Sequence, residues 1–340
     1  MRKYLLPERG NFYKANLHCH TTLSDGYLSP DEVKRVYREK GYSVVAFTDH
    51  FVMHDHSALC DDGFVAINGY ELILNGKQPL TENPRTKKSY HLNLLAKSPS
   101  VTAQVCFSPD TVWGKARDYV PFVSYVGDMW DYSDYSVTAA NRIIAEANAN
   151  GFAVCYNHPA WSLHTGEDYC SLSGLLGVEV VNGTSVANGF GDDNSSVYSQ
   201  MLYNDVSLVP IAADDNHNEF GTEGERADSF IGFNMIKADR LDYGSVMEAL
   251  LQGHTYASSG PLFHELYIEN GMLHVKCSPV CRVILSTLDR GNVCIQRQNG
   301  ESVTECDIPL NEKRKHFRVE LVDSNGNRAF SRMYTDDGIS

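Results

Sequence analysis

The stretch HCHTTLSDG, residues 18–26, carries the pattern from which the fold can be worked out. It overlaps the end of an apolar segment, FYKANLH (12–18), that we predict to be a buried strand. His18 and His20 lie two residues apart at the end of this strand, so both side chains project from the same face. Asp25 follows in a Ser-Asp-Gly turn. Two imidazoles delivered in this way can hold one metal ion, and the stretch therefore predicts a metal site at a strand end.

Further apolar runs downstream also read as buried strands. They are SVVAFTDH (43–50), FVAINGYELIL (64–74), YHLNLLA (90–96), FAVCYNH (152–158), GVEVVNG (177–183), VSLVPIAADD (206–215) and SFIGFNMIK (229–237). Most carry residue types that bind metals at or near an end. These candidate ligands are His50, Glu71, His91, His158, Asp215 and His217, with Asp49 beside His50.

The number and type of these side chains favour a multinuclear site. Strand ends of a barrel converge on one rim, where barrel enzymes keep their active sites. Nine candidate ligands, counted with His18, His20 and Asp25, exceed what one ion needs, so we expect two or three divalent ions. Mixed imidazole and carboxylate ligands suit zinc, manganese or iron.

Helices are predicted between the strands. SPDEVKRVYREKG (29–41) has Ser29 as N-cap, Pro30 at the first helical position, Glu32 completing a capping box and Gly41 as its stop. Two more helices are expected at about 135–150 and 245–252. Alternation of strands and helices argues for an α/β fold with a mostly parallel sheet, and the strand count favours a closed or nearly closed barrel.

The pattern changes after YASSGP (256–261). Seven short strands with frequent turn signals follow: ELYIE, LHVKC, RVILSTL, VCIQRQ, VTECDI, HFRVELV and RAFSRMY. Such spacing is typical of a small antiparallel β-sandwich. We therefore expect a catalytic domain at 1–260 and a β-sandwich domain at 261–340.

The composition and net charge of the chain limit the kinds of molecule it is expected to bind. The 340-residue chain carries a net charge of −14, which opposes loose binding to nucleic acid beyond a nucleotide or short oligonucleotide. A small phosphorylated substrate fits, because bound metals reverse the field locally. Nine single cysteines without a CxxC pair, and an amino-terminal segment without an apolar core for a signal peptide, predict a cytoplasmic protein. No membrane association is expected, and the sequence leaves the oligomeric state open.

HCHTTLSDG resembles the first motif of the PHP (polymerase and histidinol phosphatase) family of metal-dependent phosphoesterases. TDH (48–50), YEL (70–72), NHP (157–159) and DDNH (214–217) resemble its later motifs in the same order. The resemblance covers about residues 10–260. It implies a distorted seven-stranded (β/α) barrel of TIM-like type with a two- or three-metal site at the carboxyl rim.

The resemblance also distributes the ligands. One ion would be held by His18, His20, Glu71 and Asp215. Glu71 would bridge to a second ion, held also by His91 and His158. A third would be held by Asp25, His50 and His217, with Asp25 standing where some members carry histidine. Asp49 would orient a ligand, and Glu179 and Asn182 would support the site from outside.

The implied reaction is hydrolysis of a phosphomonoester or a small nucleotide phosphodiester by a metal-activated water. Asp215, His217 and His50 are the predicted catalytic residues, and either histidine could protonate the leaving group. Arg85, Lys88 and Arg226 are predicted to bind substrate, unless they are solvated loop charges. Two alternatives stay open: an amidohydrolase-type reaction on a C–N bond, and a non-catalytic metal-binding or scaffold protein.

Overall fold

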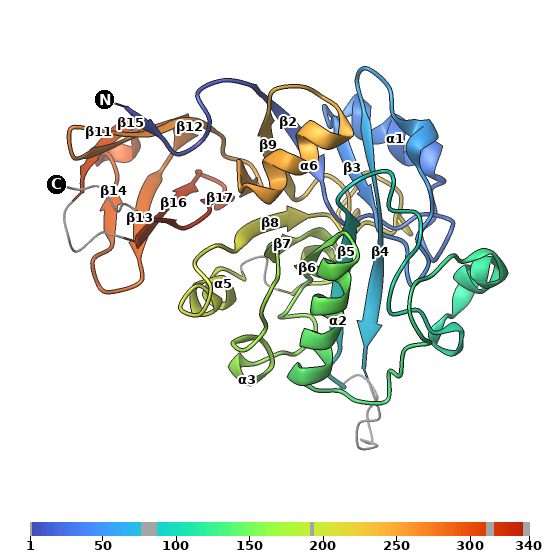
Figure 1. Cartoon of the computed structure of the whole chain (residues 1–340). Coiled ribbons are helices and arrows are strands. Elements are labelled where there is room, and N and C mark those ends of the chain that lie inside the picture. Colours follow the sequence, from blue (N-terminus) through green and yellow to red (C-terminus); the bar gives the residue numbers. More distant parts are fainter. Residues whose placement is uncertain (1, 76–86, 191–193, 311–315, 336–340) are drawn as a thin grey trace.

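The protein has two lobes (Figure 1). A computed structural model describes residues 2–75, 87–190, 194–310 and 316–335. The larger lobe holds a curved mixed sheet with helices, and the smaller lobe holds the carboxyl-terminal strands. The predicted α/β fold followed by antiparallel β structure is therefore confirmed at this level. None of the helices in these four ranges has the length and apolar character needed to cross a membrane.

Each strand predicted for the larger lobe is present. In chain order they are β2 (Asn11–Asn16), β3 (Val44–Phe47), β4 (Val65–Leu74), β5 (Tyr90–Ala96), β6 (Phe152–Tyr156), β7 (Gly177–Asn182), β8 (Val209–Ala213) and β9 (Phe233–Ala238). Two further short strands, β1 (Lys3–Tyr4) and β10 (Thr255–Ser258), lack the long apolar run on which the sequence prediction depends.

The three predicted helices are also present, as α1 (Pro30–Glu39), α2 (Val137–Ala149) and α6 (Tyr243–Leu251). In α1 the Ser29 side chain accepts from the Glu32 amide, and the Glu32 carboxylate accepts from Ser29, as the capping box predicts. The remaining helical segments are short. They are η1 (Ser57–Leu59), η3 (Pro109–Thr111), η4 (Gly114–Phe122), α3 (Gly166–Tyr169), α4 (Gly183–Ala187), α5 (Ser195–Met201) and η5 (Gln298–Gly300).

The sheet is mixed, whereas a mostly parallel sheet was expected. β2, β3 and β4 are parallel neighbours, as are β6, β7 and β8, but β5 runs antiparallel to both β4 and β6. The start of β5 therefore lies at the rim where the parallel strands end. The Asn157 amide just after β6 donates to the His91 carbonyl at 3.0 Å, which places the start of β5 beside the end of β6.

β4 joins the two parallel groups by changing partner along its length. Val65–Asn68 pairs with β3, whereas Gly69–Leu74 pairs with β5. A Cβ at Gly69 would lie 2.9 Å from the Leu94 carbonyl oxygen, so glycine permits the close approach at the change. The second half of β4 carries Glu71 to the rim.

The strand pairing does not show the closed seven-stranded barrel. β8 pairs with β7, and its other edge pairs with no strand in the described ranges. At this edge of β8, the Asn234 side chain of β9 makes hydrogen bonds to the β8 backbone instead of a strand-to-strand pairing. Its Nδ2 donates to the Pro210 carbonyl at 3.1 Å, and its Oδ1 accepts from the Ala212 amide at 2.9 Å.

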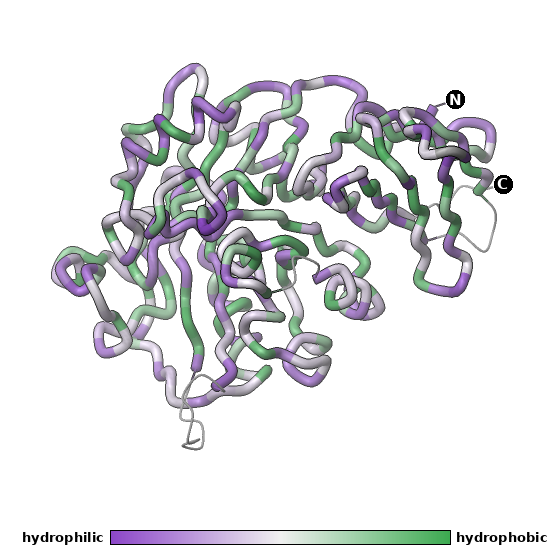
Figure 2. The backbone as a smooth tube through the Cα atoms, turned by 180° about the vertical axis from the view of Figure 1, so that it is seen from behind, coloured by the Kyte–Doolittle hydropathy of each residue, from purple (hydrophilic) through white to green (hydrophobic). Residues whose placement is uncertain are grey.

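Buried apolar side chains explain why the sheet curves around its own core. Small and branched side chains fill the inner face, among them Ala15, Val44, Val65, Cys155 and Ile211. The α2 helix packs its apolar side against the other face of β6. Figure 2 shows the same distribution, with hydrophobic segments along the strands and hydrophilic ones in the turns. All nine cysteines lie in the described ranges and are free thiols.

All seven carboxyl-terminal strands are present, but they divide between two sheets. The strands are β11 (Phe263–Glu269), β12 (Met272–Val280), β13 (Arg282–Thr287), β14 (Val293–Ile295), β15 (Val303–Pro309), β16 (His316–Val322) and β17 (Arg328–Ser331), with a short β18 (Tyr334–Thr335). β11, β12 and β15 form an antiparallel sheet with β1. The others extend the large sheet through the pairing of β17 with β10. A domain boundary near Gly260 stays a prediction.

Glu320 on β16 provides a test of the packing of these strands. Its carboxylate, buried in the described structure, lies 2.7 Å from Arg318 and 2.5 Å from Arg328. Glu320→Gln should lower the free energy of unfolding by about 3–5 kcal/mol, because a buried arginine then lacks its counter-charge. Urea unfolding measures this loss. The matched change Glu265→Gln, in an exposed pair with Lys276, should cost at most about 1 kcal/mol. Equal losses in both variants would contradict the buried pair.

Candidate metal centre

Two histidine-containing segments lie side by side at the rim. Beyond β2 and β8 the chain continues so that residues 18–20 run parallel to residues 215–216. The Asp215 amide donates to the His18 carbonyl at 2.9 Å, and the His20 amide donates to the Asn216 carbonyl at 3.1 Å. These two hydrogen bonds bring the side chain of Asp215 next to those of His18 and His20, although Asp215 lies almost 200 residues further along the sequence.

Glu71 is the centre of the site. It projects from β4 and is only 1% exposed. Asn157 donates to its Oε1 at 2.8 Å and fixes the carboxylate. Five histidine nitrogens lie 3.0–3.5 Å from its oxygens, from His18, His20, His50, His91 and His158. One carboxylate thus faces histidines delivered by four different strand ends.

The nine predicted ligand residues fall into three groups, each with ligand atoms within 4.8 Å of one another. The first group is His18, His20 and Asp215. The second is Glu71, His91 and His158. The third is His20, Asp25, His50 and His217. This grouping differs from the partition that the family resemblance implies in two members: His20 belongs to two groups, and Glu71 belongs only to the second. Metal binding by each residue stays a prediction.

Hydrogen bonds outside the groups turn the histidines toward their centre. His18 Nδ1 lies 2.7 Å from Glu179 Oε1, and His217 Nδ1 donates to the Asp215 carbonyl at 2.8 Å. His158 Nδ1 lies 3.3 Å from the Ser162 hydroxyl. When Nδ1 carries the proton, Nε2 keeps its lone pair, and in all three residues Nε2 faces a carboxylate of the site.

The three residues predicted to support the site from outside belong to the hydrogen-bond network around it: Asp49, Glu179 and Asn182. Asp49 accepts from the Thr21 amide at 2.8 Å and from the Ser24 hydroxyl at 2.6 Å, so it holds the turn that carries Asp25. Asn182 Nδ2 donates to Glu179 at 2.8 Å and to Asp215 at 3.2 Å. Glu179 also accepts from the His158 amide at 2.8 Å.

The donor set fits divalent cations. His18 Nε2 and His20 Nε2 lie 3.1 Å apart, and each is 3.0 Å from Asp215 Oδ1. His20 Nδ1 and His50 Nδ1 are buried and make no well-aligned hydrogen bond in the described structure, although His50 Nδ1 lies 3.0 Å from Glu71 Oε2 and His20 Nδ1 lies 3.5 Å from Asp25 Oδ1. Imidazole lone pairs and carboxylate oxygens are all acceptors, so they cannot hydrogen-bond to one another. A bound cation satisfies them together.

The carboxylates also control the pKa values of the site. Burial disfavours the charged form of His50, but the charges and hydrogen bonds of Glu71 and Asp25 together outweigh burial and raise the pKa to about 10. For His217 burial is likewise outweighed, here by the hydrogen bond to Asp25 together with the charges of Asp215 and Asp25, and the pKa rises to about 9. Despite burial, the hydrogen bonds and charges of His217, His50 and His20 together hold the pKa of Asp25 well below its ordinary range. At His50 and His217 the surrounding carboxylates therefore stabilise positive charge.

The predicted substrate-binding cations have different surroundings. Lys88 forms an ion pair with Asp168 at 2.6 Å. Arg226 is exposed, and its guanidinium lies 3.4 Å from the ring centre of Phe220. Arg85 lies outside the described residues. None of these contacts tests substrate binding, which stays a prediction for all three.

Sequence reasoning missed several residues of the site. Asn157 precedes His158, yet its bond to Glu71 depends on the antiparallel β5, which the pattern did not indicate. Asp228 accepts from the His217 amide at 2.7 Å, and no spacing signal connects the two. Trp113 contacts the His50 ring with a centroid distance of 5.0 Å. It lies in the irregular segment between β5 and α2, where periodicity is absent.

The turn that carries Asp25 depends on Gly26. A Cβ at Gly26 would lie 2.6 Å from the His20 carbonyl oxygen and 2.7 Å from the Thr21 amide nitrogen, both in the backbone. Gly26→Ala should therefore displace the turn, lower kcat/KM for the hydrolysis predicted from the sequence by on the order of a hundredfold and destabilise the fold by about 1–3 kcal/mol. Kinetics and urea unfolding measure the two effects.

Gly244 is the matched control, because its Cβ would meet nothing closer than 3.5 Å. Gly244→Ala should leave both quantities within experimental error or slightly raise stability. Full activity in Gly26→Ala would show that the turn does not position the site.

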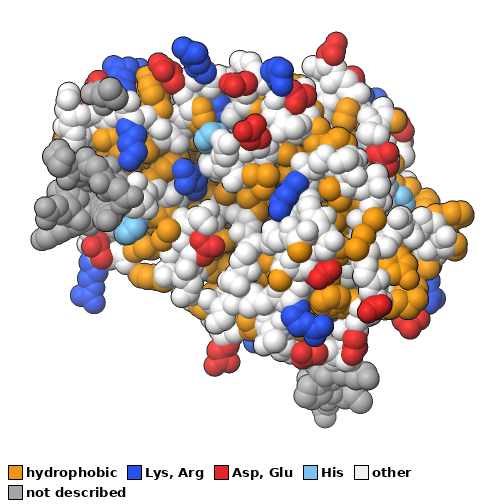
Figure 3. All heavy atoms as spheres, viewed as in Figure 1, with side chains coloured by type: hydrophobic (Ala, Val, Ile, Leu, Met, Phe, Trp, Pro, Cys, Tyr) orange, Lys and Arg blue, Asp and Glu red, His pale blue; other side chains and the backbone are white. Residues whose placement is uncertain are grey.

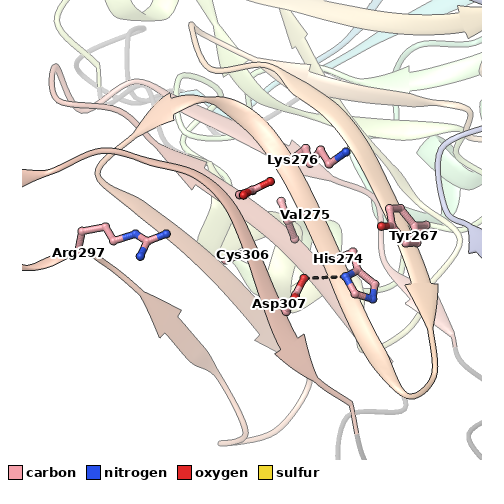
Figure 4. Close-up of a pocket in the computed structure, with 8 residues that line it drawn as sticks. Tyr267, His274, Val275, Lys276, Arg297, Cys306 and Asp307 are labelled. Atoms are coloured by element: carbon pink, nitrogen blue, oxygen red, sulfur yellow. Dashed lines mark hydrogen bonds and ion pairs between the residues drawn. The ribbon is translucent and has the colours of Figure 1, made fainter.

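A hollow of about 420 Å³ lies far from this rim, on the outer face of the β11–β12–β15 sheet (Figure 4). Its polar side chains largely pair with their neighbours. His274 Nδ1 lies 2.6 Å from Asp307 Oδ1, and Lys276 Nζ lies 3.0 Å from Glu265 Oε1. We therefore assign the chemistry to the rim.

The PHP domain family model matches residues 16–148, which confirms the predicted family resemblance over that part of the chain. The NHP and DDNH motifs lie beyond the matched residues. No curated protein sequence matches the chain significantly.

Three solved structures are similar at 16% sequence identity. A two-domain protein from Bacteroides vulgatus ATCC 8482, in which a PHP-like metal-dependent phosphoesterase is predicted, covers 98% of both chains with a TM-score of 0.47. A metal-dependent phosphoesterase from Bifidobacterium adolescentis covers 64% of this chain and 91% of its own, with a TM-score of 0.37. An amidohydrolase from Chromobacterium violaceum with bound sulfate covers 71% and 96%, with a TM-score of 0.42. These low scores and identities carry no functional argument.

Proposed function

We propose that the protein is a metal-dependent phosphoesterase that hydrolyses a small phosphomonoester or nucleotide phosphodiester. The observation that carries this proposal is Glu71, a buried carboxylate within 3.5 Å of five histidine nitrogens. Divalent ions bound there would lower the pKa of water and neutralise charge on the phosphoryl oxygens. Zinc, manganese and iron suit the mixed donor set.

Each of the three groups of residues would hold one metal ion. His18, His20 and Asp215 would hold the first ion, and Glu71 would connect it to the ion held by His91 and His158. Asp25, His50 and His217 would hold the third. Glu179 orients His18, and the Asp215 carbonyl orients His217. Because Glu71 contacts histidines of all three groups and His20 belongs to two of them, a change at either residue would disturb more than one ion.

Where no third ion is bound, proton transfer to the leaving group would fall to His217, because a histidine whose Nε2 binds metal has no proton to give there. Its side chain is a quarter exposed, whereas His50 is 7% exposed, so His217 is the more accessible to an incoming ester. The Asp215 carbonyl fixes its Nδ1, and its Nε2 lies 3.5 Å from Asp25. Asp215 would act by holding metal and by orienting His217 through its main chain.

A small substrate fits the surface. Within the described residues, every ion-pair partner of Asp25, Glu71 and Asp215 is a histidine. On the face shown in Figure 3, basic and acidic side chains are interspersed and form no continuous basic track. With a net charge of −14, this argues for a compact ester over a long polynucleotide.

Two structural expectations accompany the function. We infer that the seven strands β2–β8 act as a distorted barrel whose ring is completed at the rim by residues 18–20 and 215–216. We also infer that residues 261–340 form a separate unit that supports or caps the catalytic lobe. A cytoplasmic location stays the expectation from the sequence.

A substrate screen tests the proposed function. Purified protein supplied with Mn²⁺ or Zn²⁺ is assayed on phosphomonoesters, phosphodiesters and amides, beside an Asp215→Ala variant. We expect hydrolysis of at least one class of phosphoester and its loss in the variant. Hydrolysis of amides alone would favour an amidohydrolase, and activity on no ester would favour a binding or scaffold role. Phosphoesterase activity that survives Asp215→Ala would also overturn the assignment.

A further inference from the structure

Two tryptophans are exposed beside the metal groups. Trp113 is 43% exposed and Trp161 is 40% exposed, although tryptophan is among the most apolar of side chains. They come from unrelated loops: Trp113 precedes η4, and Trp161 follows the NHP motif after β6. Single exposed apolar residues need no explanation, but two that both touch the same buried site do.

Each tryptophan packs directly on predicted ligands. The Trp113 ring lies 5.0 Å from the ring of His50, between centroids. The Trp161 ring lies 5.3 Å from His91 and 5.0 Å from His158, edge to face with both. The His50 and His91 rings are themselves 6.3 Å apart. The four rings Trp113, His50, His91 and Trp161 therefore form one continuous row along the rim.

The loop of Trp161 is held in place by its own bonds. The Ser162 amide donates to the His158 carbonyl at 3.1 Å, and the His164 amide donates to the Pro159 carbonyl at 3.1 Å. His158 has a φ of 26° and Leu163 a φ of 58°, both in the left-handed region that side chains disfavour. A tight, strained turn thus presents an indole to solvent at a fixed position.

Exposed aromatic side chains beside the metal groups are suited to recognising the organic part of a substrate. Metal ions at the three groups would bind the phosphate, and the described residues offer no cationic side chain paired with their carboxylates. Phosphate contacts do not distinguish one ester from another. Rigid aromatic faces do, because flat π-bearing groups stack on them and gain from leaving water.

We propose that Trp113 and Trp161 are specificity residues that bind a flat aromatic group of the ester, such as a nucleobase or a phenyl ring. This inference rests on the proposed function, since it concerns the same site. It narrows the substrate class to aromatic or nucleotide phosphates and excludes small aliphatic and simple sugar phosphates as preferred substrates.

Kinetics of matched esters test the inference. Trp113→Leu and Trp161→Leu are assayed on phenyl phosphate and on ethyl phosphate with Mn²⁺. Each change should lower kcat/KM for the phenyl ester by about tenfold to a hundredfold, mainly through KM. The ethyl ester should change by less than about twofold. Trp113→Phe and Trp161→Phe should keep most of the wild-type kcat/KM for the phenyl ester. Equal losses on both esters, no loss on either, or a wild-type preference for sugar phosphates would overturn the inference.

A fluorescence experiment separates this inference from the proposed function. The chain has three tryptophans, and the third, Trp130, packs under Arg142. Proteins that keep only Trp113, only Trp161 or only Trp130, with phenylalanine at the other two positions, are titrated with adenosine monophosphate and with glycerol phosphate. Adenosine monophosphate should quench Trp113 and Trp161 saturably but leave Trp130 unchanged, and glycerol phosphate should quench none. This result can hold even if no ester is hydrolysed. Quenching of Trp130 alone, or of none of the three, would overturn the inference.

Discussion

Glu71→Gln is expected to reduce kcat/KM for the preferred phosphoester by on the order of a thousandfold. Glutamine keeps the shape of the side chain but replaces one oxygen by an NH₂ group and removes the negative charge. That NH₂ group would face histidine nitrogens that already lie within 3.5 Å of the carboxylate. Because Glu71 contacts members of all three groups, the metal content of the purified variant should fall together with its activity.

Substitutions of two other glutamates serve as controls for this result. Glu179→Gln changes a buried carboxylate that orients His18 without facing the centre of the site, and it should cost about tenfold to a hundredfold in kcat/KM. Glu39→Gln lies in an exposed pair with Arg35 on α1 and should change nothing measurable. A Glu71→Gln enzyme with the activity and metal content of Glu39→Gln would show that Glu71 is only a buried structural carboxylate.

Removal of metal should abolish activity and also weaken the fold. Three carboxylates and six histidines converge at the rim, and their mutual contacts are favourable only when positive charge is present. Ions at a hundred times their dissociation constant would stabilise the folded state by about 2.7 kcal/mol for each independent site. Dialysis against a chelator should therefore lower the urea midpoint as well as the rate.

The control for this experiment is readdition. Mn²⁺ or Zn²⁺ should restore both activity and stability to the wild-type protein, whereas Ca²⁺ should restore neither, because imidazole ligands do not suit it. The Glu71→Gln variant should gain little stability from any of these ions. A chelated wild-type protein with unchanged activity would rule out metal-dependent chemistry.

Much of the fold could be predicted because its signals are local. The α1 helix has a complete capping box, and the strands of the larger lobe are continuous apolar runs bounded by polar loops. Histidines and carboxylates placed at strand ends then predicted one shared site. The side chains of His18 and Asp215 do meet there, with 3.0 Å between Nε2 and Oδ1.

What could not be predicted depends on pairings between distant segments. No pattern in YHLNLLA indicates that β5 runs antiparallel, although this direction is what brings His91 to Glu71. The change of partner within β4 likewise depends on contacts made by Gly69, which reads from sequence as an ordinary strand glycine. Trp113 lies among irregular turns, where neither helical nor strand periodicity exists to place it.

The most direct test of the central claim is a crystal structure of the protein grown with Mn²⁺ or Zn²⁺, with anomalous diffraction recorded at the edge of that metal. We predict two or three anomalous peaks at the rim, with Glu71 oxygens shared between the ion near His18 and His20 and the ion near His91 and His158. A single ion held without Glu71, or no peak at the rim, would contradict the multinuclear site.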